Sequence, residues 1–297
     1  MKGWLIAALL AAPLAAPLAA PLAAAAPAAT APAATAPAAT APRYSIEEIR
    51  LADSIGDSVA QMVIGAPPDQ KIDDIYALWL IRGNGRIILF DSGFHRPRWF
   101  KEWTIRNYLR PDRAVALAGV KPETVTDIIV SHAHWDHMGG IDLFPRAMIW
   151  IQKEEYRYYT GPAWQPGGDH GGIDPEDVTE LVRANTQGRV RWVDGDQEIF
   201  PGIHAYRGAR HTYASQYLWI EGDPPFVLAS DNVYLYRNLE EHKPSATFEP
   251  ADYPANLAHQ QHMIDLAGRM ERVIPGHDAL PFSRYPTQGR IATLRAP

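Results

Sequence analysis

From Tyr44 onward, the order of hydrophobic and polar residues predicts alternating strands and helices. Two apolar runs, Ile75–Ile81 and Arg86–Phe90, flank Gly83-Asn84-Gly85, which is typical of a β-hairpin. Further strand patterns occur at the end of Lys121–His132, at Arg146–Ile151 and in Arg189–Gly208, Gln216–Gly222 and Pro225–Asn232. Helical patterns occur at Trp99–Ala118, Glu154–Tyr159, Asp177–Asn185 and Pro254–Met270.

The predicted helices and strands are mixed along the chain, and the strands include antiparallel hairpins near both ends. This order favours an α/β (α+β) fold in which helices cover sheet layers, and it argues against a simple parallel wound sheet. A Gly/Pro-rich stretch, 161–177, is too long to be only a connection between two elements.

The first 43 residues have a different composition from the rest of the chain. Residues 1–26 contain one lysine, a short apolar core and many small residues, which predicts a secretory signal peptide with an uncertain cleavage site. Prolines recur from Pro13 onward and argue against a membrane-spanning helix. Residues 27–43 form a Pro/Ala-rich linker, so we expect one domain at 44–297 and a periplasmic or secreted protein without a stable membrane anchor.

Charge and cysteine content exclude several classes of protein. The chain has 28 basic and 34 acidic residues, a net charge of −6, and no block of basic residues, so nucleic-acid binding is not expected. It contains no cysteine, which excludes disulfides and thiolate metal ligands. Any metal must therefore be held by imidazole, carboxylate and water.

Coordinating side chains are concentrated in the segment SHAHWDHMGG, which directly follows the apolar run 128–130. His132 and His134 are two residues apart at a strand end, so their side chains can converge on one metal. Asp136 and His137 follow on the next turn and can face a second metal. Imidazole and carboxylate donors suit zinc, although manganese, iron and cobalt are also compatible. Three histidines and an aspartate at this spacing predict a metal site far more strongly than a chance cluster.

One loop cannot complete two metal sites, and three residues at other strand ends are candidates for the remaining ligands. His211 would join His132 and His134 at the first site, with His204 as its rival. His277 would join Asp136 and His137 at the second. Asp231 has two oxygens and could bridge two ions about 3.5–4 Å apart.

This ordered set resembles the metallo-β-lactamase superfamily over nearly the whole chain from residue 44. HAHWDH resembles the family's His-x-His-x-Asp-His motif, IILFDSG its early strand ending in Asp-Ser/Thr-Gly, and PGHD the segment with the last histidine. The family writes Pro-Gly-His-Thr-x-Gly around the third histidine, whereas this chain has GARHTYAS. The resemblance implies an αββα sandwich of two mixed sheets flanked by helices, with two Zn²⁺ at one edge.

Within this superfamily, DNVY at 231–234 resembles the branch of N-acyl-homoserine lactonases, in which a tyrosine follows the bridging aspartate. The resemblance implies a dinuclear hydrolase that opens a lactone ring, foremost that of N-acyl-homoserine lactones, by attack of a metal-bridging hydroxide. Tyr234 would donate to the developing oxyanion, and Asp136 could carry the proton to the leaving oxygen. A homodimer is compatible with the sequence.

Three other functions stay open from the sequence alone. A periplasmic metallo-β-lactamase and a phosphotriester or aryl-ester hydrolase would share the fold and the nucleophile. A non-catalytic metal-binding protein would need no Tyr234.

Two further predictions concern residues outside the motif. Asp91 should support the metal loop rather than act in catalysis. The aromatic residues of the predicted helix at 99–118 should be core residues, and these are Trp99, Phe100, Trp103 and Tyr108.

Overall fold

The computed structural model describes residues 44–245 and 247–296, so the predicted signal peptide (1–26) and linker (27–43) lie outside the described residues. The described strands form two sheets. The nine-stranded sheet contains β13 (Thr287–Gln288), β14 (Ile291–Arg295), β1 (Ser45–Ser58), β2 (Lys71–Gly83), β3 (Arg86–Phe90), β5 (Asp127–Ile129), β6 (Met148–Gln152) and β7 (Val190–Val193) in this order, and β4 (Ile105–Arg106) pairs with β1. The five-stranded sheet contains β12 (Val273–Pro275), β11 (Phe226–Ser230), β10 (Gln216–Ile220), β9 (Ile203–Arg207) and β8 (Gln197–Phe200).

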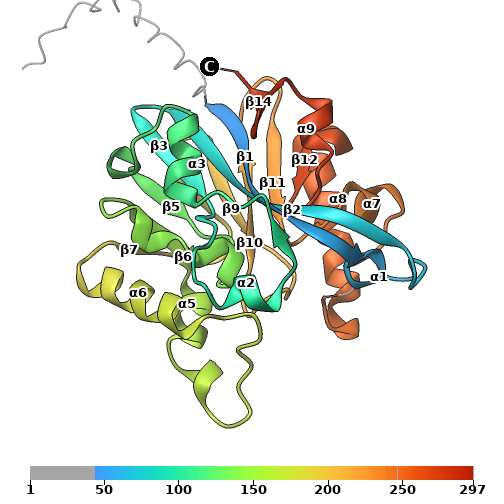
Figure 1. The fold of residues 1–297 in the computed structure, drawn as a ribbon, viewed down its shortest axis with the longest axis horizontal. Helices are drawn as coiled ribbons and strands as arrows, with labels where there is room; N and C mark the ends of the chain where they lie inside the picture. Colours follow the sequence, from blue (N-terminus) through green and yellow to red (C-terminus); the bar gives the residue numbers. More distant parts are fainter. Residues whose placement is uncertain (1–43, 246, 297) are drawn as a thin grey trace, which may run out of the picture. The chain divides into compact units, whose positions relative to one another are not determined.

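Helices cover the outer side of each sheet, as Figure 1 shows for α5 and α6 on one side and α8 on the other. The helices of the described residues are α1 (Val59–Met62), α2 (Trp99–Glu102), α3 (Pro111–Leu117), α4 (Trp135–Met138), α5 (Lys153–Tyr159), α6 (Pro175–Thr186), α7 (Tyr236–Glu240), α8 (Tyr253–Ala267) and α9 (Pro281–Arg284). None of the helices within 44–245 and 247–296 has the length and apolar character that a membrane crossing requires.

The alternation of side chains along the strands explains the layers. In β2, Leu78 and Leu80 belong to the core beneath α2, α3, α5 and α6, while Trp79 and Ile81 belong to the core between the two sheets. In β11, Leu228 faces that central core and Val227 faces the core beneath α7 and α8. Successive side chains of a strand point to opposite faces, so both faces of each sheet bury apolar surface. The predicted αββα sandwich is confirmed.

Both sheets mix parallel and antiparallel pairs, as expected. The predicted hairpin is present: β2 and β3 pair antiparallel, and Asn84 and Gly85 between them have φ of 50° and 73°. Two consecutive residues with positive φ form the tight turn that matches the twist of a hairpin. From β3 onward, β5, β6 and β7 are parallel, which directs the ends of β3 and β5 to one edge of the sheet.

One predicted element is wrong. The continuous helix at 99–118 is instead the short helices α2 and α3, with β4 between them pairing Arg106 with Asp53 of β1. Asn107 has φ of 51°, outside the helical region, and Pro111 disfavours helical backbone at the residue before it. The apolar periodicity of this segment therefore spans two helices with an edge strand between them.

Candidate metal centre

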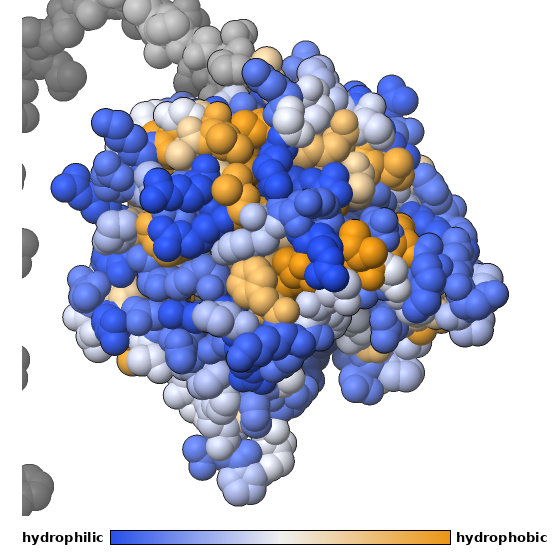
Figure 2. All heavy atoms as spheres, viewed as in Figure 1, coloured by the Kyte–Doolittle hydropathy of each residue, from blue (hydrophilic) through white to orange (hydrophobic). Residues whose placement is uncertain are grey.

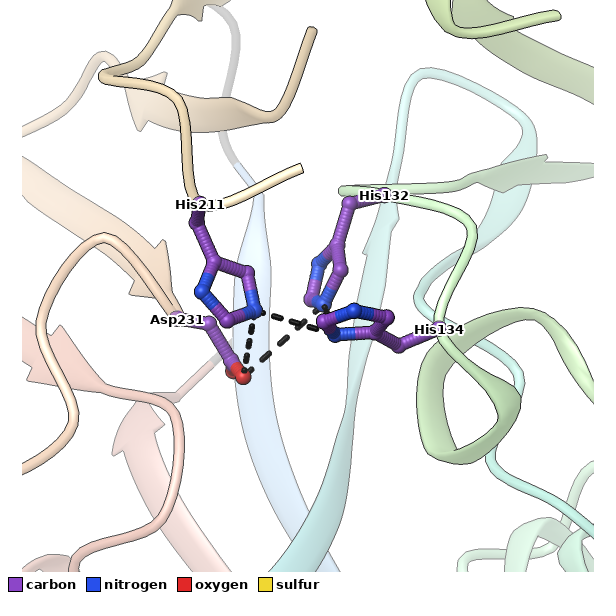
Figure 3. Close-up of side chains that lie close together, drawn as sticks. All are labelled: His132, His134, His211 and Asp231. Atoms are coloured by element: carbon purple, nitrogen blue, oxygen red, sulfur yellow. Dashed lines mark hydrogen bonds and ion pairs between the residues drawn. The ribbon is translucent and has the colours of Figure 1, made fainter. Parts of the chain in front are cut away.

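The structure brings all seven predicted ligand side chains together at one edge of the sandwich. They form two groups whose potential ligand atoms lie within 4.8 Å of one another. The first ligand group is His132, His134, His211 and Asp231, and the second ligand group is Asp136, His137 and His277. Figure 3 shows the four side chains of the first group pointing toward a common centre from three separate segments. That these residues bind metal stays a prediction.

In the first ligand group, ring nitrogens lie at the spacing of ligands around one ion. His134 Nδ1 is 3.0 Å from both His132 Nε2 and His211 Nε2, and His211 Nε2 is 3.3 Å from Asp231 Oδ2. Donors at about 2.0–2.1 Å from a tetrahedral zinc are separated by about 3.3 Å, so these spacings fit such an ion. His134 Nδ1 faces two nitrogens but can share a proton with only one of them, which a cation between the three rings would resolve.

The second ligand group also contacts Asp231, His137 through Oδ1 and His277 through both oxygens. Asp231 Oδ1 is 3.2 Å from both His137 Nε2 and His277 Nε2. Asp136 Oδ2 is 3.2 Å from His137 Nε2 and 3.7 Å from His277 Nε2. These distances are typical of side chains that bind the same metal ion. His137 Nε2 and Asp231 Oδ1 are buried without a hydrogen-bond partner. Unpartnered buried polar atoms are costly, so the donor set fits a bound cation here as well.

The ring nitrogens of His137 and His277 that point away from the centre lie within hydrogen-bonding distance of buried neighbours. Asp91 Oδ2 is 2.8 Å from His137 Nδ1, and its Oδ1 accepts from Ser131 N at 2.7 Å, which agrees with the predicted supporting role. The carbonyl of Ile75 on β2 is 2.8 Å from His277 Nδ1. Such partners hold each ring so that its other nitrogen points inward.

Glu155, on α5, is a residue that the sequence did not single out. Its buried carboxylate accepts from Ala133 N at 2.9 Å, Thr212 Oγ1 at 2.7 Å and Ala214 N at 2.6 Å. It therefore joins the loop that contains His134 to the loop that contains His211. In the sequence it appears as one polar residue of QKEEYRYY, and no local feature separates it from its exposed neighbour Glu154.

Electrostatics favour neutral imidazole at His134 and charged carboxylate at Asp231. Burial, with His211 beside it, lowers the pKa of His134 to about 3, so its ring keeps a free lone pair at neutral pH. Although burial opposes the change, His137 and His277 hold the pKa of Asp231 well below its ordinary value. Neutral imidazoles and ionised carboxylates are the states that bind divalent metals. In the second ligand group, although burial opposes the change, Asp136 and Asp231 raise the pKa of His137 well above its ordinary value and that of His277 to about 9, so a cation bound there would replace these protons.

Gly276, in the PGHD segment, cannot be replaced by a larger residue without a clash, because it lies against the carboxylate of Asp231. A Cβ on Gly276 would lie 2.7 Å from Asp231 Oδ1 and 2.9 Å from the carbonyl carbon of Ser230. Ser230 itself has φ of 47°, a conformation that non-glycine residues adopt only when their surroundings impose it. This turn at the end of β11 directs Asp231 into the cluster.

The centre opens into a cavity of about 600 Å³, within the range of small-molecule sites. Tyr234 lines it, with its ring stacked on His277 at 5.1 Å between centroids and 5.7 Å from the ring of His211. The loop within 161–177 also contributes, through Asp169, Gly171 and Gly172. Among the residues that line this cavity in the described part of the chain, none is lysine or arginine.

The structure tests two further predictions from the sequence: that His211 rather than His204 joins the first ligand group, and that four aromatic residues belong to the core. His204 lies on β9 near Glu198, 3.6 Å away, and not with the cluster, so His211 is the histidine that joins the first ligand group. Of the four aromatic residues predicted to be core, Trp99 is buried and stacks on Trp135 at 4.8 Å, while Phe100 and Tyr108 pack against the same core. Trp103 differs: it is 45% exposed and lines the cavity. Its prediction as a core residue is wrong, because the helix on which it was placed ends before it.

Comparisons with known proteins agree with this geometry. A family model described as the metallo-beta-lactamase superfamily matches residues 74–277. An N-acyl homoserine lactonase of a Bacillus species is 30% identical over 162 residues, which are 54% of this chain and 57% of that protein. Another from Agrobacterium fabrum is 23% identical over 233 residues, covering 71% of this chain and 82% of that protein.

A crystal structure of a quorum-quenching N-acyl homoserine lactone lactonase has a TM-score of 0.67 and 19% identity, covering 82% of this chain and 95% of that chain. At 19% identity, this similarity shows that the two proteins share a fold and does not by itself show a shared function. The match to the Bacillus relative spans 57% of that protein's length. The family model, in contrast, spans both ligand groups and most of the strands of the two sheets. This chain belongs to the metallo-beta-lactamase superfamily.

Proposed function

We propose that the protein is a dinuclear metal-dependent hydrolase that opens lactone rings, foremost those of N-acyl homoserine lactones. The observation on which this depends is Asp231, which lies between the two ligand groups: His211 Nε2 is 3.3 Å from its Oδ2, His137 Nε2 is 3.2 Å from its Oδ1, and His277 Nε2 is within 3.3 Å of both oxygens. This bridging position, with Tyr234 beside it on the cavity wall, is the arrangement that the lactonase resemblance implies. The names of the similar proteins support the same substrate class.

Two zinc ions are the cofactor that we propose for these donors. When bound, such ions lower the pKa of a bound water and polarise a carbonyl group, which supplies a nucleophile at neutral pH. The first ligand group offers three imidazoles and one carboxylate oxygen, and the second offers two imidazoles and two carboxylate oxygens. Asp231 would be shared by the two sites, because its carboxylate contacts histidines of both ligand groups.

Tyr234 is the proposed donor to the substrate oxygen that gains negative charge. Burial, followed by the nearby carboxylate of Asp231, raises the pKa of Tyr234 well above its ordinary value, so the phenol keeps its proton at neutral pH. A donor that is placed beforehand on the cavity wall stabilises the transition state more than the ground state. Asp136 lies among the second ligand group, so a ligand role fits its position better than the proposed proton transfer.

The cavity wall favours an uncharged substrate over a β-lactam. Cephalosporins and penicillins contain a carboxylate, which a lysine or arginine would recognise, and the described lining residues include neither. N-acyl homoserine lactones have no charge and need no such partner. A phosphotriester is also uncharged, so it stays the second candidate. The proposed periplasmic or secreted location depends on residues 1–43 and is a separate proposal.

A substrate panel on the metal-loaded protein tests the function. It contains acyl lactones of several chain lengths, a chromogenic cephalosporin and a phosphotriester, each measured with and without a chelator. We expect the highest kcat/KM for an acyl lactone and loss of turnover with the chelator. Faster hydrolysis of the cephalosporin or the phosphotriester would contradict the lactone assignment, and turnover that survives complete metal removal would contradict the metal mechanism.

A further inference from the structure

A pair of carboxylates lies in the cavity outside the seven ligand side chains. Asp57, at the end of β1, and Asp74, on β2, both line the cavity, and their side chains are within hydrogen-bonding reach of each other. In Figure 2, hydrophobic residues lie over the arm formed by β1 and β2, beside a mostly hydrophilic surface. The arm thus presents two acidic groups to the cavity.

Asp74 is held close to the metal centre by its place on β2. The next residue, Ile75, accepts from His277 through its carbonyl at 2.8 Å and donates from its own N–H to the carbonyl of His277 at 3.2 Å. Asp74 and Tyr76 are two residues apart, so their side chains share a face of the strand, and Tyr76 contacts the ring of His277 edge-on at 5.7 Å. The carboxyl group of Asp74 therefore has a fixed position beside the second ligand group.

One oxygen of this carboxyl group has no partner in the protein. Asp74 is only 5% exposed, and its Oδ1 has no hydrogen-bond partner among the described residues. A buried acceptor left unpaired is unfavourable, and the few that occur in native proteins often serve a ligand. Burial raises the pKa of Asp74 to about 8, with His277 opposing and Asp57 adding to the change. The free Oδ1 keeps a lone pair in either state.

We propose that Asp74, supported by Asp57, forms a subsite that accepts a hydrogen bond from an amide N–H of the substrate. This inference depends on the proposed lactonase function and names the substrate feature that the site selects. In an N-acyl homoserine lactone, the amide nitrogen is attached to the ring carbon next to the lactone carbonyl. When that carbonyl faces the metal centre, the N–H projects toward the surrounding cavity wall, to which Asp74 belongs.

The test compares two substrates that differ only at this group. One is an N-acyl homoserine lactone, and the other is its analogue with CH₂ in place of the N–H and the same chain length. We expect the wild-type protein to prefer the amide by roughly tenfold or more, mainly through a lower KM, because the contact exists before and during the reaction.

Variants then locate the contact. Asp74→Ala should bring the preference close to one. Asp74→Asn should keep most of it, because the amide NH₂ can donate to Asp57 and leave its oxygen toward the cavity. Asp69→Ala, at an exposed position before β2, is the matched control and should keep the full preference. Because each variant is judged by a ratio between two substrates, partial loss of folded protein does not alter the result.

The outcomes separate this inference from the function on which it depends. Equal hydrolysis of both lactones by the wild-type protein, or a preference that survives Asp74→Ala, would overturn the subsite and leave the lactonase proposal intact. A metal-loaded protein that hydrolyses neither lactone would overturn the proposed function and the subsite together.

Discussion

The two ligand groups of the metal centre are supported by different parts of the fold. In the second ligand group, His277 is bonded to the backbone of β2 and His137 to Asp91, just after β3. In the first ligand group, His134 and His211 lie on loops that are joined through the carboxylate of Glu155. A ligand bonded to a sheet keeps its position more easily than one on a loop. We therefore expect the first ligand group to lose its metal before the second.

Asp231 belongs to the first ligand group and also contacts His137 and His277 of the second, so its removal should have the largest effect. Asp231→Ala removes one ligand oxygen from each group and leaves His137 and His277 without their nearest negative charge. We expect both metal occupancy and kcat/KM to fall by more than the roughly 10- to 100-fold that outer partners contribute. Metal content after dialysis, measured by mass spectrometry, checks this. Retention of two ions per chain would contradict the bridging role.

Tyr234 contacts a ring from each group without belonging to either, which separates catalysis from metal binding. Tyr234→Phe keeps the stacking on His277 and removes only the hydroxyl. We expect turnover to fall by up to about 100-fold with two metal ions still bound, since the variant loses a donor to the oxyanion. Unchanged turnover would remove Tyr234 from the mechanism, and loss of metal would make it a structural residue.

Glu155→Gln should distinguish the two groups directly. Glutamine cannot accept from three donors in the same geometry, so the loops of His134 and His211 lose their connection. We expect metal affinity at the first ligand group to fall by roughly 10- to 100-fold while the second is maintained, giving one ion per chain at limiting metal.

Glu154→Gln, on the same helix with its side chain 42% exposed, is the control and should bind two ions. Equal loss from both groups in Glu155→Gln would show that the two halves of the centre are not independently supported.

The same carboxyl group should make the metal-free protein sensitive to pH. Burial raises the pKa of Glu155 to about 7, although its bonds to Thr212, Ala214 and Ala133 oppose the change. The folded state then binds more protons than the unfolded state between about pH 4.5 and pH 7, so this contribution to stability is lost as the pH rises through that range.

The check is a comparison of unfolding free energies with Glu155→Gln in chelator. The difference, wild type minus variant, should be greater at pH 4.5 than at pH 8 by on the order of 1–2 kcal/mol. A difference that stays constant with pH would contradict a protonated Glu155 in the fold.

The smallest effect is expected where the loop within 161–177 contacts the first ligand group. A Cβ on Gly172 would lie 2.9 Å from Cδ2 of His134, so Gly172→Ala should displace that ring and reduce kcat/KM a few-fold. Gly167→Ala is the matched control, because Gly167 also has positive φ, of 84°, but no atom near its added Cβ. Equal loss in both variants would mean that backbone strain, and not His134, is responsible.

The sequence by itself determined the layers of the fold and the identity of the proposed ligands. Both depend on local patterns: strand alternation decides which face of a sheet is buried, and each proposed ligand follows directly after a strand or its turn. The hairpin at Asn84-Gly85 and the motif at 132–137 are of this kind. The helix expected at 99–118 was wrong because pairing of Arg106 with Asp53, far apart in the chain, outweighed local periodicity.

Tertiary structure alone decided that Glu155 supports the ligand loops and that Asp57 and Asp74 line the cavity. Glu155 looks like any polar residue of a short helix until folding places it against Ala133 and Thr212, 22 and 57 residues away. Asp74 and Asp57 lie on neighbouring strands, and nothing in their local sequence indicates that one oxygen stays unpaired beside the centre. Burial and hydrogen-bond partners are properties of the packed chain, since they depend on contacts that no short segment contains.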